Sequence, residues 1–180
     1  MQQEAIERFG DVTWEGSKQT ALGRMLVPGD RAPDADLVNP DLDLLRLSSY
    51  AGRVLLLSTV PSLDTQVCNL ETRHWNEEAR DLAPGLVVLT VSMDLPFAQQ
   101  RWNDDASIQQ PVASAHNSEE FGIAYGVLIK EKRLLSRAVF IIDAGSVVRF
   151  VEYVTEVDDH PDYVKALTVV RSLLSAATAS

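Results

Sequence analysis

Two apolar runs near the middle of the chain predict buried strands. Residues 54–60 and residues 86–92 consist almost wholly of valine, leucine, serine and threonine. Strands that are apolar on both faces are typical of parallel sheets that helices cover on each side. We therefore expect these runs to form two strands at the centre of an α/β domain.

The segment between the two strands has the period of an amphipathic helix. Trp75, Ala79 and Leu82 recur at i, i+4 and i+7, and a Pro-Gly pair follows them. The pattern predicts a helix from residue 67 to about residue 82. Such a helix connects the strands as a right-handed crossover.

Capping residues predict two short helices further along the chain. Asp94 can cap the first, which would have Pro96 in its first turn. Asn117 can cap the second, which would run through Tyr125, and Glu120 is placed to complete a capping box.

The last third of the chain predicts an antiparallel hairpin and a closing helix. Residues 137–143 and residues 147–154 are apolar strands joined by an Ala-Gly-Ser turn. The closing helix starts near Pro161 and has one apolar stripe. The members of this stripe are Tyr163, Ala166, Leu167, Val170 and Leu174.

The N-terminal segment has little regular pattern. At residues 9–16, Val12 and Trp14 alternate between two glycines, which predicts a small β-hairpin. From residue 54 onward the order is strand, helix, strand, helix, hairpin, helix, as in a thioredoxin-like fold. We expect an α/β fold with a central mixed sheet flanked by helices, as one domain over residues 1–180 in which residues 1–30 carry the hairpin.

Charge and composition exclude several classes of protein. The chain has 180 residues, is 46% hydrophobic and has 16 basic against 26 acidic residues, a net charge of −10. This acidity argues against binding to nucleic acid or to an anionic membrane surface. No apolar run approaches the ~20 residues of a membrane span, and the first residues do not resemble a secretory signal. With one cysteine, these features predict a protein of the reducing cytoplasm.

The sequence predicts neither a metal nor a cofactor. His74, His116 and His160 are each more than 40 positions from the next, and no CxxC, HxH or HExxH spacing occurs. The glycine-rich nucleotide motifs GxGxxG and GxxxxGK[ST] are also absent.

The chemistry that remains centres on Cys68, the single cysteine. It follows the first buried strand at the start of the predicted helix, which places it at the carboxyl end of the sheet, where ligands bind in such folds. A lone cysteine is often only a small buried apolar residue. If Thr65 or Asp64 caps the helix, however, Cys68 lies in its first turn, where free N–H groups favour a thiolate.

A helix N-terminus alone is too weak to ionise this thiol. It contributes at most about 1 kcal/mol at an exposed site, and Asp64, Glu71 and the net charge oppose the thiolate. A reactive thiolate therefore requires a nearby guanidinium. The candidates are Arg73 and Arg137; position i+5 puts Arg73 on a different helix face from Cys68, which favours Arg137.

At this point the motifs resemble a known family. Pro61-x-x-x-Thr65-x-x-Cys68 resembles the PxxxTxxC signature of peroxiredoxins. Residues 61–68 and the Asp-Leu-Pro-Phe-Ala-Gln segment within residues 91–102 are similar to the bacterial thiol peroxidase subfamily.

The resemblance implies a peroxidase with four site residues. Cys68 would be the thiolate that attacks the peroxide bond and becomes a sulfenic acid. Thr65 would hold the sulfur and the incoming oxygen through its hydroxyl, Arg137 would stabilise the thiolate and the leaving oxygen, and Pro61 would shield the sulfur from water. The substrates would be hydrogen peroxide and organic hydroperoxides.

One departure from the family concerns the reductant. Thiol peroxidases usually have a resolving cysteine directly after an Arg-Phe or Arg-Trp pair, whereas Arg101-Trp102 is followed here by Asn103. An external thiol would therefore resolve the sulfenic acid: a small thiol, thioredoxin or a similar protein. The alternative is a peroxide sensor of the same fold with little turnover. The resemblance also implies a homodimer, with its contact near the active-site loops.

Overall fold

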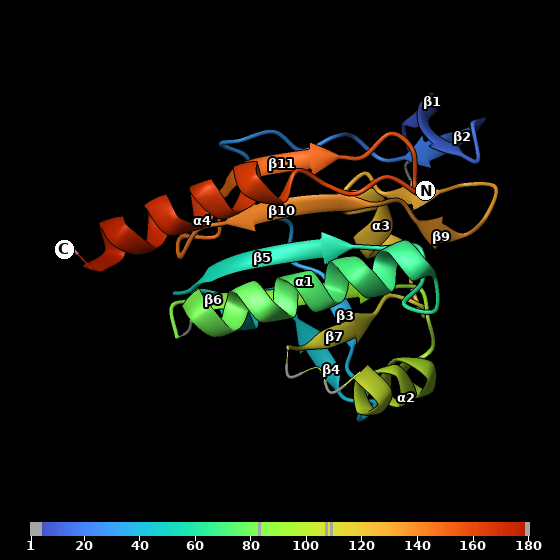
Figure 1. Ribbon diagram of the computed structural model, residues 1–180. Helices are drawn as coiled ribbons and strands as arrows, with labels where there is room; N and C mark the ends of the chain where they lie inside the picture. The colour runs from blue at the N-terminus through green and yellow to red at the C-terminus, as the bar shows by residue number, and fades with distance from the viewer. Residues whose placement is uncertain (1–4, 83, 107, 109, 179–180) are drawn as a thin grey trace.

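The computed structural model describes residues 5–178 except residues 83, 107 and 109 (Figure 1). The strands in this part of the chain are β1 Glu7–Trp14, β2 Ser17–Leu22, β3 Asp36–Val38, β4 Leu44–Arg46, β5 Val54–Thr59, β6 Leu86–Ser92, β7 Val112–Ser114, β8 Leu128–Ile129, β9 Leu134–Leu135, β10 Ala138–Ile142 and β11 Val148–Tyr153. The helices are the 3₁₀ helix η1 Leu47–Tyr50 and the α-helices α1 Gln66–Leu82, α2 Pro96–Ala106, α3 Glu120–Ala124 and α4 Tyr163–Thr178.

A mixed sheet forms the centre of the molecule, as the sequence predicts. Its strand order is β11-β10-β5-β6-β7-β3-β4. The central strands β5, β6 and β7 run parallel, and β10, β11, β3 and β4 add to them in antiparallel pairs. A second sheet, of order β1-β2-β8-β9, joins the N-terminal hairpin to the short strands before β10.

Helices cover the central sheet because β5 is apolar on both faces. Leu56 packs with Trp75 of α1 and Val170 of α4, whereas Leu55 and Leu57 face the opposite core. Figure 1 shows α1 and α4 on the same face of the sheet. The predicted crossover helix, the parallel strand pair and the apolar stripe of the last helix are all confirmed.

The predicted N-terminal hairpin exists, but it extends over β1 and β2, from Glu7 to Leu22, and not only over residues 9–16. The turn lies at Glu15 and Gly16, which both have positive φ, and β2 follows it. Gly10 is therefore inside β1, where the pairing with β2 shifts between Phe9 and Val12. A glycine within a strand often marks such a bulge, and the sequence analysis took it for a strand end.

Neither predicted helix cap is present among the described contacts. The side chain of Asp94 bonds to Ser62 and to the backbone of Leu63, and among the described contacts it has no bond to an N–H group of α2. The N-cap residue of α3 is Glu119, which makes no side-chain capping bond, and not Asn117. A capping pattern in sequence cannot reveal that a distant loop competes for the same carboxylate.

Substitution of Gly23 tests the close contact between the N-terminal hairpin and the backbone of α3. It has φ +92°, and a Cβ built there would lie 1.8 Å from the carbonyl oxygen of Ile123. We expect Gly23→Ala to lower the free energy of unfolding by more than about 3 kcal/mol, since steric overlap adds to backbone strain. Gly29→Ala is the matched control, because Gly29 has φ +100° but open space around it. It should cost only about 1–2 kcal/mol. Equal losses in urea unfolding would contradict the close contact.

Candidate active site

Cys68 is the third residue of α1 and lies beyond the carboxyl end of β5. Its side chain is completely buried. It packs in a small apolar cluster with Val60, Leu63 and Trp102, the last of which comes from α2. This burial fits a cysteine that only fills space in the core, but the sulfur also has a charged neighbour.

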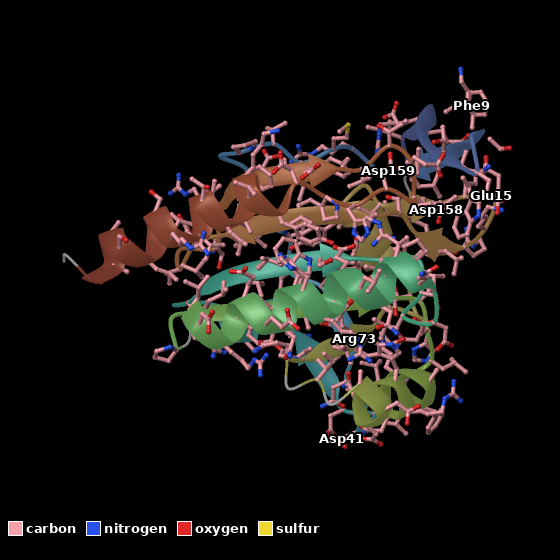
Figure 2. The ribbon with its side chains drawn as sticks, viewed as in Figure 1. Phe9, Glu15, Asp41, Arg73, Asp158 and Asp159 are labelled. Atoms are coloured by element: carbon pink, nitrogen blue, oxygen red, sulfur yellow. The ribbon has the colours of Figure 1, made fainter. Side chains whose placement is uncertain are left out.

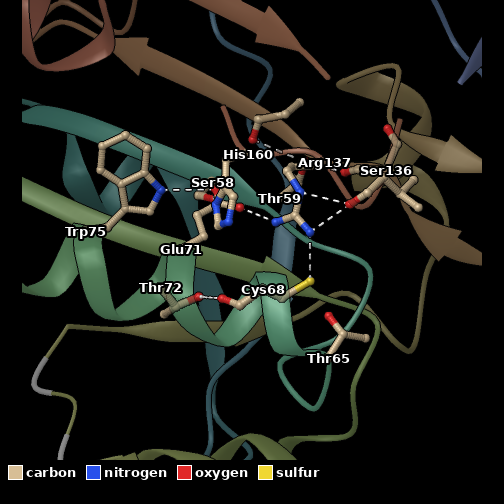
Figure 3. Close-up of polar contacts among 12 residues, drawn as sticks. Ser58, Thr59, Thr65, Cys68, Glu71, Thr72, Trp75, Ser136, Arg137 and His160 are labelled. Carbon is tan, nitrogen blue, oxygen red and sulfur yellow. Dashed lines mark hydrogen bonds and ion pairs between the residues drawn. The ribbon is translucent and has the colours of Figure 1, made fainter. Parts of the chain in front are cut away.

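That neighbour is Arg137, the residue just before β10 (Figure 3). Its Nη2 lies 3.2 Å from Cys68 Sγ. Its Nε and Nη2 also donate to the carbonyl oxygen of Val157, at 3.1 and 2.9 Å. Its Nη1 forms an ion pair with Glu71, and only 1% of the Arg137 side chain is exposed. The guanidinium is thus fixed by three partners, two on α1 and one in the segment after β11.

The other candidate arginine is used elsewhere. Arg73 lies on the outer side of α1 (Figure 2), where its Nε donates to Asn69 Oδ1 at 2.6 Å. Its Nη1 donates to the carbonyl oxygen of Ala106 at 3.2 Å, which ties α1 to the end of α2. Helical spacing favoured Arg137 over Arg73, and in the structure Arg137 contacts the sulfur while Arg73 bonds to Asn69 and Ala106.

Burial and charge act in opposite directions on Arg137. Burial lowers the pKa of its guanidinium, but the negative charges of Glu71 and Cys68 raise it more, so the net shift is upward. Arg137 therefore keeps its positive charge, and a buried cation lies beside the sulfur of Cys68.

Glu71 was misjudged in the sequence analysis, which counted it only as a charge that opposes the thiolate. Besides its ion pair with Arg137, it accepts hydrogen bonds from Ser58 Oγ at 2.8 Å and Trp75 Nε1 at 3.1 Å. It is completely buried. Because Glu71 follows Cys68 by three residues, helical spacing already placed it on the face of the helix that carries Cys68. A carboxylate buried on that face requires a buried cation as its partner. The sequence could therefore have indicated that Glu71 pairs with the arginine beside Cys68.

Asp94 fixes the loop that leads into α1. One carboxylate oxygen accepts from Ser62 Oγ at 2.7 Å, and the other accepts from the Leu63 N–H at 2.8 Å and from Ser92 Oγ at 2.8 Å. The end of β6 therefore holds the segment that contains two predicted site residues, Pro61 and Thr65. No sequence pattern pointed to this contact.

Pro61 and Thr65 differ in how they relate to the sulfur. Pro61 is buried at the start of the loop. Thr65 lies on the loop side of Cys68 (Figure 3), and its hydroxyl donates to the carbonyl oxygen of Ser62 at 3.1 Å. Neither Thr65 nor Asp64 has its side chain bonded to an N–H of α1 among the described contacts, although the Thr65 carbonyl accepts the Asn69 N–H at 3.0 Å. In this arrangement the hydrogen of the Thr65 hydroxyl is used in the bond to Ser62.

Within the described residues, no three His, Cys, Asp or Glu side chains are grouped so that they could hold a metal ion. The helices in the same part of the chain are too short or too polar to cross a lipid bilayer.

Comparison with known proteins defines the class. The model of the AhpC/TSA family matches residues 28–151. The structure is similar to that of a peroxiredoxin-like protein from Aquifex aeolicus, with a TM-score of 0.85 and 39% identity over 95% of this chain and 99% of that one. Fold and sequence thus define a peroxiredoxin-like protein with a thioredoxin-like fold. The chain belongs to the AhpC/TSA family.

Curated relatives narrow this assignment. The thiol peroxidase of Halalkalibacterium halodurans is 48% identical over 92% of this chain and all of that protein. The thiol peroxidase of Bacillus subtilis is 40% identical over 92% of this chain and 99% of that one. A thiol peroxidase from Chromobacterium violaceum shares the fold, with a TM-score of 0.81 at 22% identity over 89% of this chain and 95% of that one. The predicted resemblance to bacterial thiol peroxidases is confirmed.

The ion pair between Glu71 and Arg137 can be tested through stability. We expect Glu71→Gln to lower the free energy of unfolding by about 3–5 kcal/mol, because it leaves a buried guanidinium uncompensated. Glu78→Gln is the matched control on the same helix. Glu78 pairs with Arg171 at 3.2 Å, but both side chains are partly exposed, so its loss should cost only about 0–1 kcal/mol. Urea unfolding measures both, and a loss below 1 kcal/mol for Glu71→Gln would contradict a structural role for the buried pair.

Proposed function

We propose that this protein is a one-cysteine thiol peroxidase that reduces hydrogen peroxide and organic hydroperoxides through Cys68. The observation that carries the proposal is the 3.2 Å contact between Arg137 Nη2 and Cys68 Sγ in a fully buried site. Membership of the AhpC/TSA family and the thiol peroxidase relatives support the same reaction.

The reaction proceeds by nucleophilic attack of sulfur on oxygen. The Cys68 thiolate attacks the terminal oxygen of the hydroperoxide, an S–O bond forms and the O–O bond breaks. The sulfur is oxidised to a sulfenic acid, and the peroxide is reduced. The departing oxygen leaves with the electron pair of the broken bond and takes a proton from solvent, which gives an alcohol from an organic hydroperoxide or one water molecule from hydrogen peroxide.

Arg137 serves both ends of this step. Before attack its charge favours the thiolate, and during attack the negative charge moves from sulfur to the leaving oxygen, within reach of the same guanidinium. Glu71 and the carbonyl oxygen of Val157 hold the guanidinium in place, so little reorganisation is needed when charge moves. Glu71 also opposes the thiolate electrostatically, and its main contribution is therefore to position Arg137.

Thr65 and Pro61 complete the proposed site. The hydroxyl of Thr65 now donates to the Ser62 carbonyl oxygen. Rotation about the C–O bond would break this hydrogen bond and let the hydroxyl donate to the thiolate or the peroxide. Pro61 is buried at the entry of the loop and presents no N–H group that would attract water. Asp94 holds both residues indirectly, through its bonds to Ser62 and Leu63.

Reduction of the sulfenic acid requires an external thiol. The chain has one cysteine, and Asn103 occupies the expected position of a resolving cysteine on α2. A small thiol, thioredoxin or a similar protein would supply the second sulfur, which fits the reducing conditions of the cytoplasm. We also propose a homodimer, because Leu95 and Phe97 are 54% and 66% exposed beside the aspartate that holds the active-site loop.

Turnover with a simple reductant tests the proposed function. With dithiothreitol present, the native protein is expected to consume hydrogen peroxide catalytically, and Cys68→Ser is expected to be inactive because it lacks the attacking thiolate. Loss of peroxide absorbance or a colorimetric peroxide assay measures this. Equal consumption by both proteins would exclude Cys68 as the nucleophile.

A second candidate, a peroxide sensor with little turnover, is favoured by the burial of Cys68, since a shielded sulfenic acid persists longer. Intact-mass measurement after one equivalent of peroxide separates the two functions. Rapid return to the reduced mass with small thiols supports the peroxidase. A persistent addition of one oxygen supports the sensor.

The role of Arg137 predicts a graded loss of reactivity. We expect Arg137→Ala to slow oxidation of Cys68 by at least about tenfold, because about 1.4 kcal/mol of thiolate stabilisation corresponds to that factor. The pH midpoint of thiol alkylation should move upward in this variant, and Arg137→Lys should fall between the two proteins. Arg73→Ala is the control, since Arg73 bonds to Asn69 and to the carbonyl oxygen of Ala106 and makes no contact with the sulfur among the described residues. An unchanged alkylation profile in folded Arg137→Ala would reject the assignment.

A further inference from the structure

A cavity lies at the end of the central sheet opposite to Cys68. Its volume is about 380 Å³, and it is open to solvent between the segment at residues 31–34, the 3₁₀ helix η1 and the turn after β10. Leu55 and Ile142, which line it, pair with each other across β5 and β10, whereas Thr59 pairs with Ala138 at the active-site end. Four residues along a strand span roughly 13 Å. The cavity is therefore separate from the proposed peroxidase site.

The inner part of the cavity is apolar. Leu47, Leu55 and Ile142 contribute aliphatic side chains, and Tyr50 and Tyr125 contribute aromatic rings. The hydroxyl of Tyr125 already donates to the carbonyl oxygen of Pro33 at 2.8 Å, so this ring presents carbon to the cavity. A cavity of this volume with an apolar floor is typical of sites for small organic ligands.

Two arginines line the same cavity. Arg53 lies over the ring of Tyr50, with its Cζ 5.6 Å from the ring centroid. Stacking holds the guanidinium by its face and leaves the N–H donors at its edge available. The main chain of Arg31 is fixed by its bridge to Val147 and by the bond from the Ala32 N–H to the carbonyl oxygen of Ser146 at 2.9 Å.

These arginines differ from most others in the chain. Most of the other arginines face a carboxylate, as Arg24 does with Asp30 and Arg171 does with Glu78. No side-chain hydrogen bond or carboxylate partner occurs for Arg31 or Arg53 in the described part of the chain. The protein has 26 acidic and 16 basic residues, yet two arginines without a carboxylate partner line one cavity. Their N–H groups are therefore available to a ligand.

The two aspartates that also line the cavity are already engaged. Asp143 accepts bonds from the N–H groups of Gly145 and Val147 at 2.9 Å and from Arg149 Nε at 2.6 Å. Asp34 accepts the Ser48 N–H at 2.9 Å. Burial raises the pKa of both carboxyls, but these hydrogen bonds lower it more. The carboxylates are therefore occupied by donors of their own, and the guanidinium groups remain free for an anion.

We propose that this cavity binds a small amphipathic monoanion, with its apolar body on the floor and its carboxylate-like head between Arg31 and Arg53. Arginine pairs with planar oxyanions through two parallel hydrogen bonds, which suits a carboxylate head. The site is a binding site and requires no chemistry at Cys68.

Octanoate is the probe for this site, with acetate as the head group alone and 1-octanol as the neutral analogue. We expect saturable binding of one octanoate per chain, at least about tenfold weaker binding of 1-octanol, since a charge-assisted hydrogen bond contributes about this factor, and no saturation with acetate. Amide chemical shifts measured by NMR should change in η1 and in the turn after β10. Binding of octanol with equal affinity, or shifts located elsewhere, would overturn the proposal.

Variants separate this site from surface binding. Arg31→Gln and Arg53→Gln are each expected to weaken octanoate binding by about tenfold, while Arg171→Gln, an exposed arginine on α4, should leave it unchanged. Cys68→Ser should bind octanoate like the native protein, and the two cavity variants should keep full peroxidase activity. Unchanged octanoate affinity in both cavity variants, with their fold verified by circular dichroism, would reject the site whatever the outcome of the peroxidase assay.

Discussion

One buried cation organises the proposed active site of this protein. The Arg137 guanidinium contacts the sulfur of Cys68, the carboxylate of Glu71 and the carbonyl oxygen of Val157, which come from two positions on α1 and from the segment after β11. A buried guanidinium without such partners would be very unfavourable. The sheet, the crossover helix and the C-terminal segment must therefore be in place together for the charge to be tolerated, and the same arrangement puts the charge beside the sulfur.

The central layer was predictable because its physical cause is local. Continuous apolar runs predicted β5 and β6, and the spacing of Trp75 and Ala79 predicted α1, since the periodicity of burial is visible in sequence. The turns and helix caps were harder to predict from the sequence. Gly10 stands at a bulge, and Asp94 bonds to a loop from a distant part of the chain, so local patterns pointed to the wrong partners.

In the candidate site, too, local features were predictable and contacts between distant residues were not. Helical spacing and electrostatic need selected Arg137 over Arg73, and the motif resemblance selected Cys68, Thr65 and Pro61. The carboxylate of Glu71 was assigned only its repulsion of the thiolate, because its charge was considered without the cation that balances it. Its partners Ser58 and Arg137 lie 13 and 66 residues away in sequence, and only the folded sheet brings them together.

Cys68 and Arg137 are 69 residues apart in the chain. The cation therefore reaches the sulfur only after β5, β10 and α1 have assembled, and an unfolded chain carries an ordinary thiol. Cys68 is completely buried in the folded protein, so a bulky alkylating reagent reaches the sulfur only in chains that have not assembled. Protection of the single cysteine from such a reagent therefore reports the folded fraction of a preparation without any added probe.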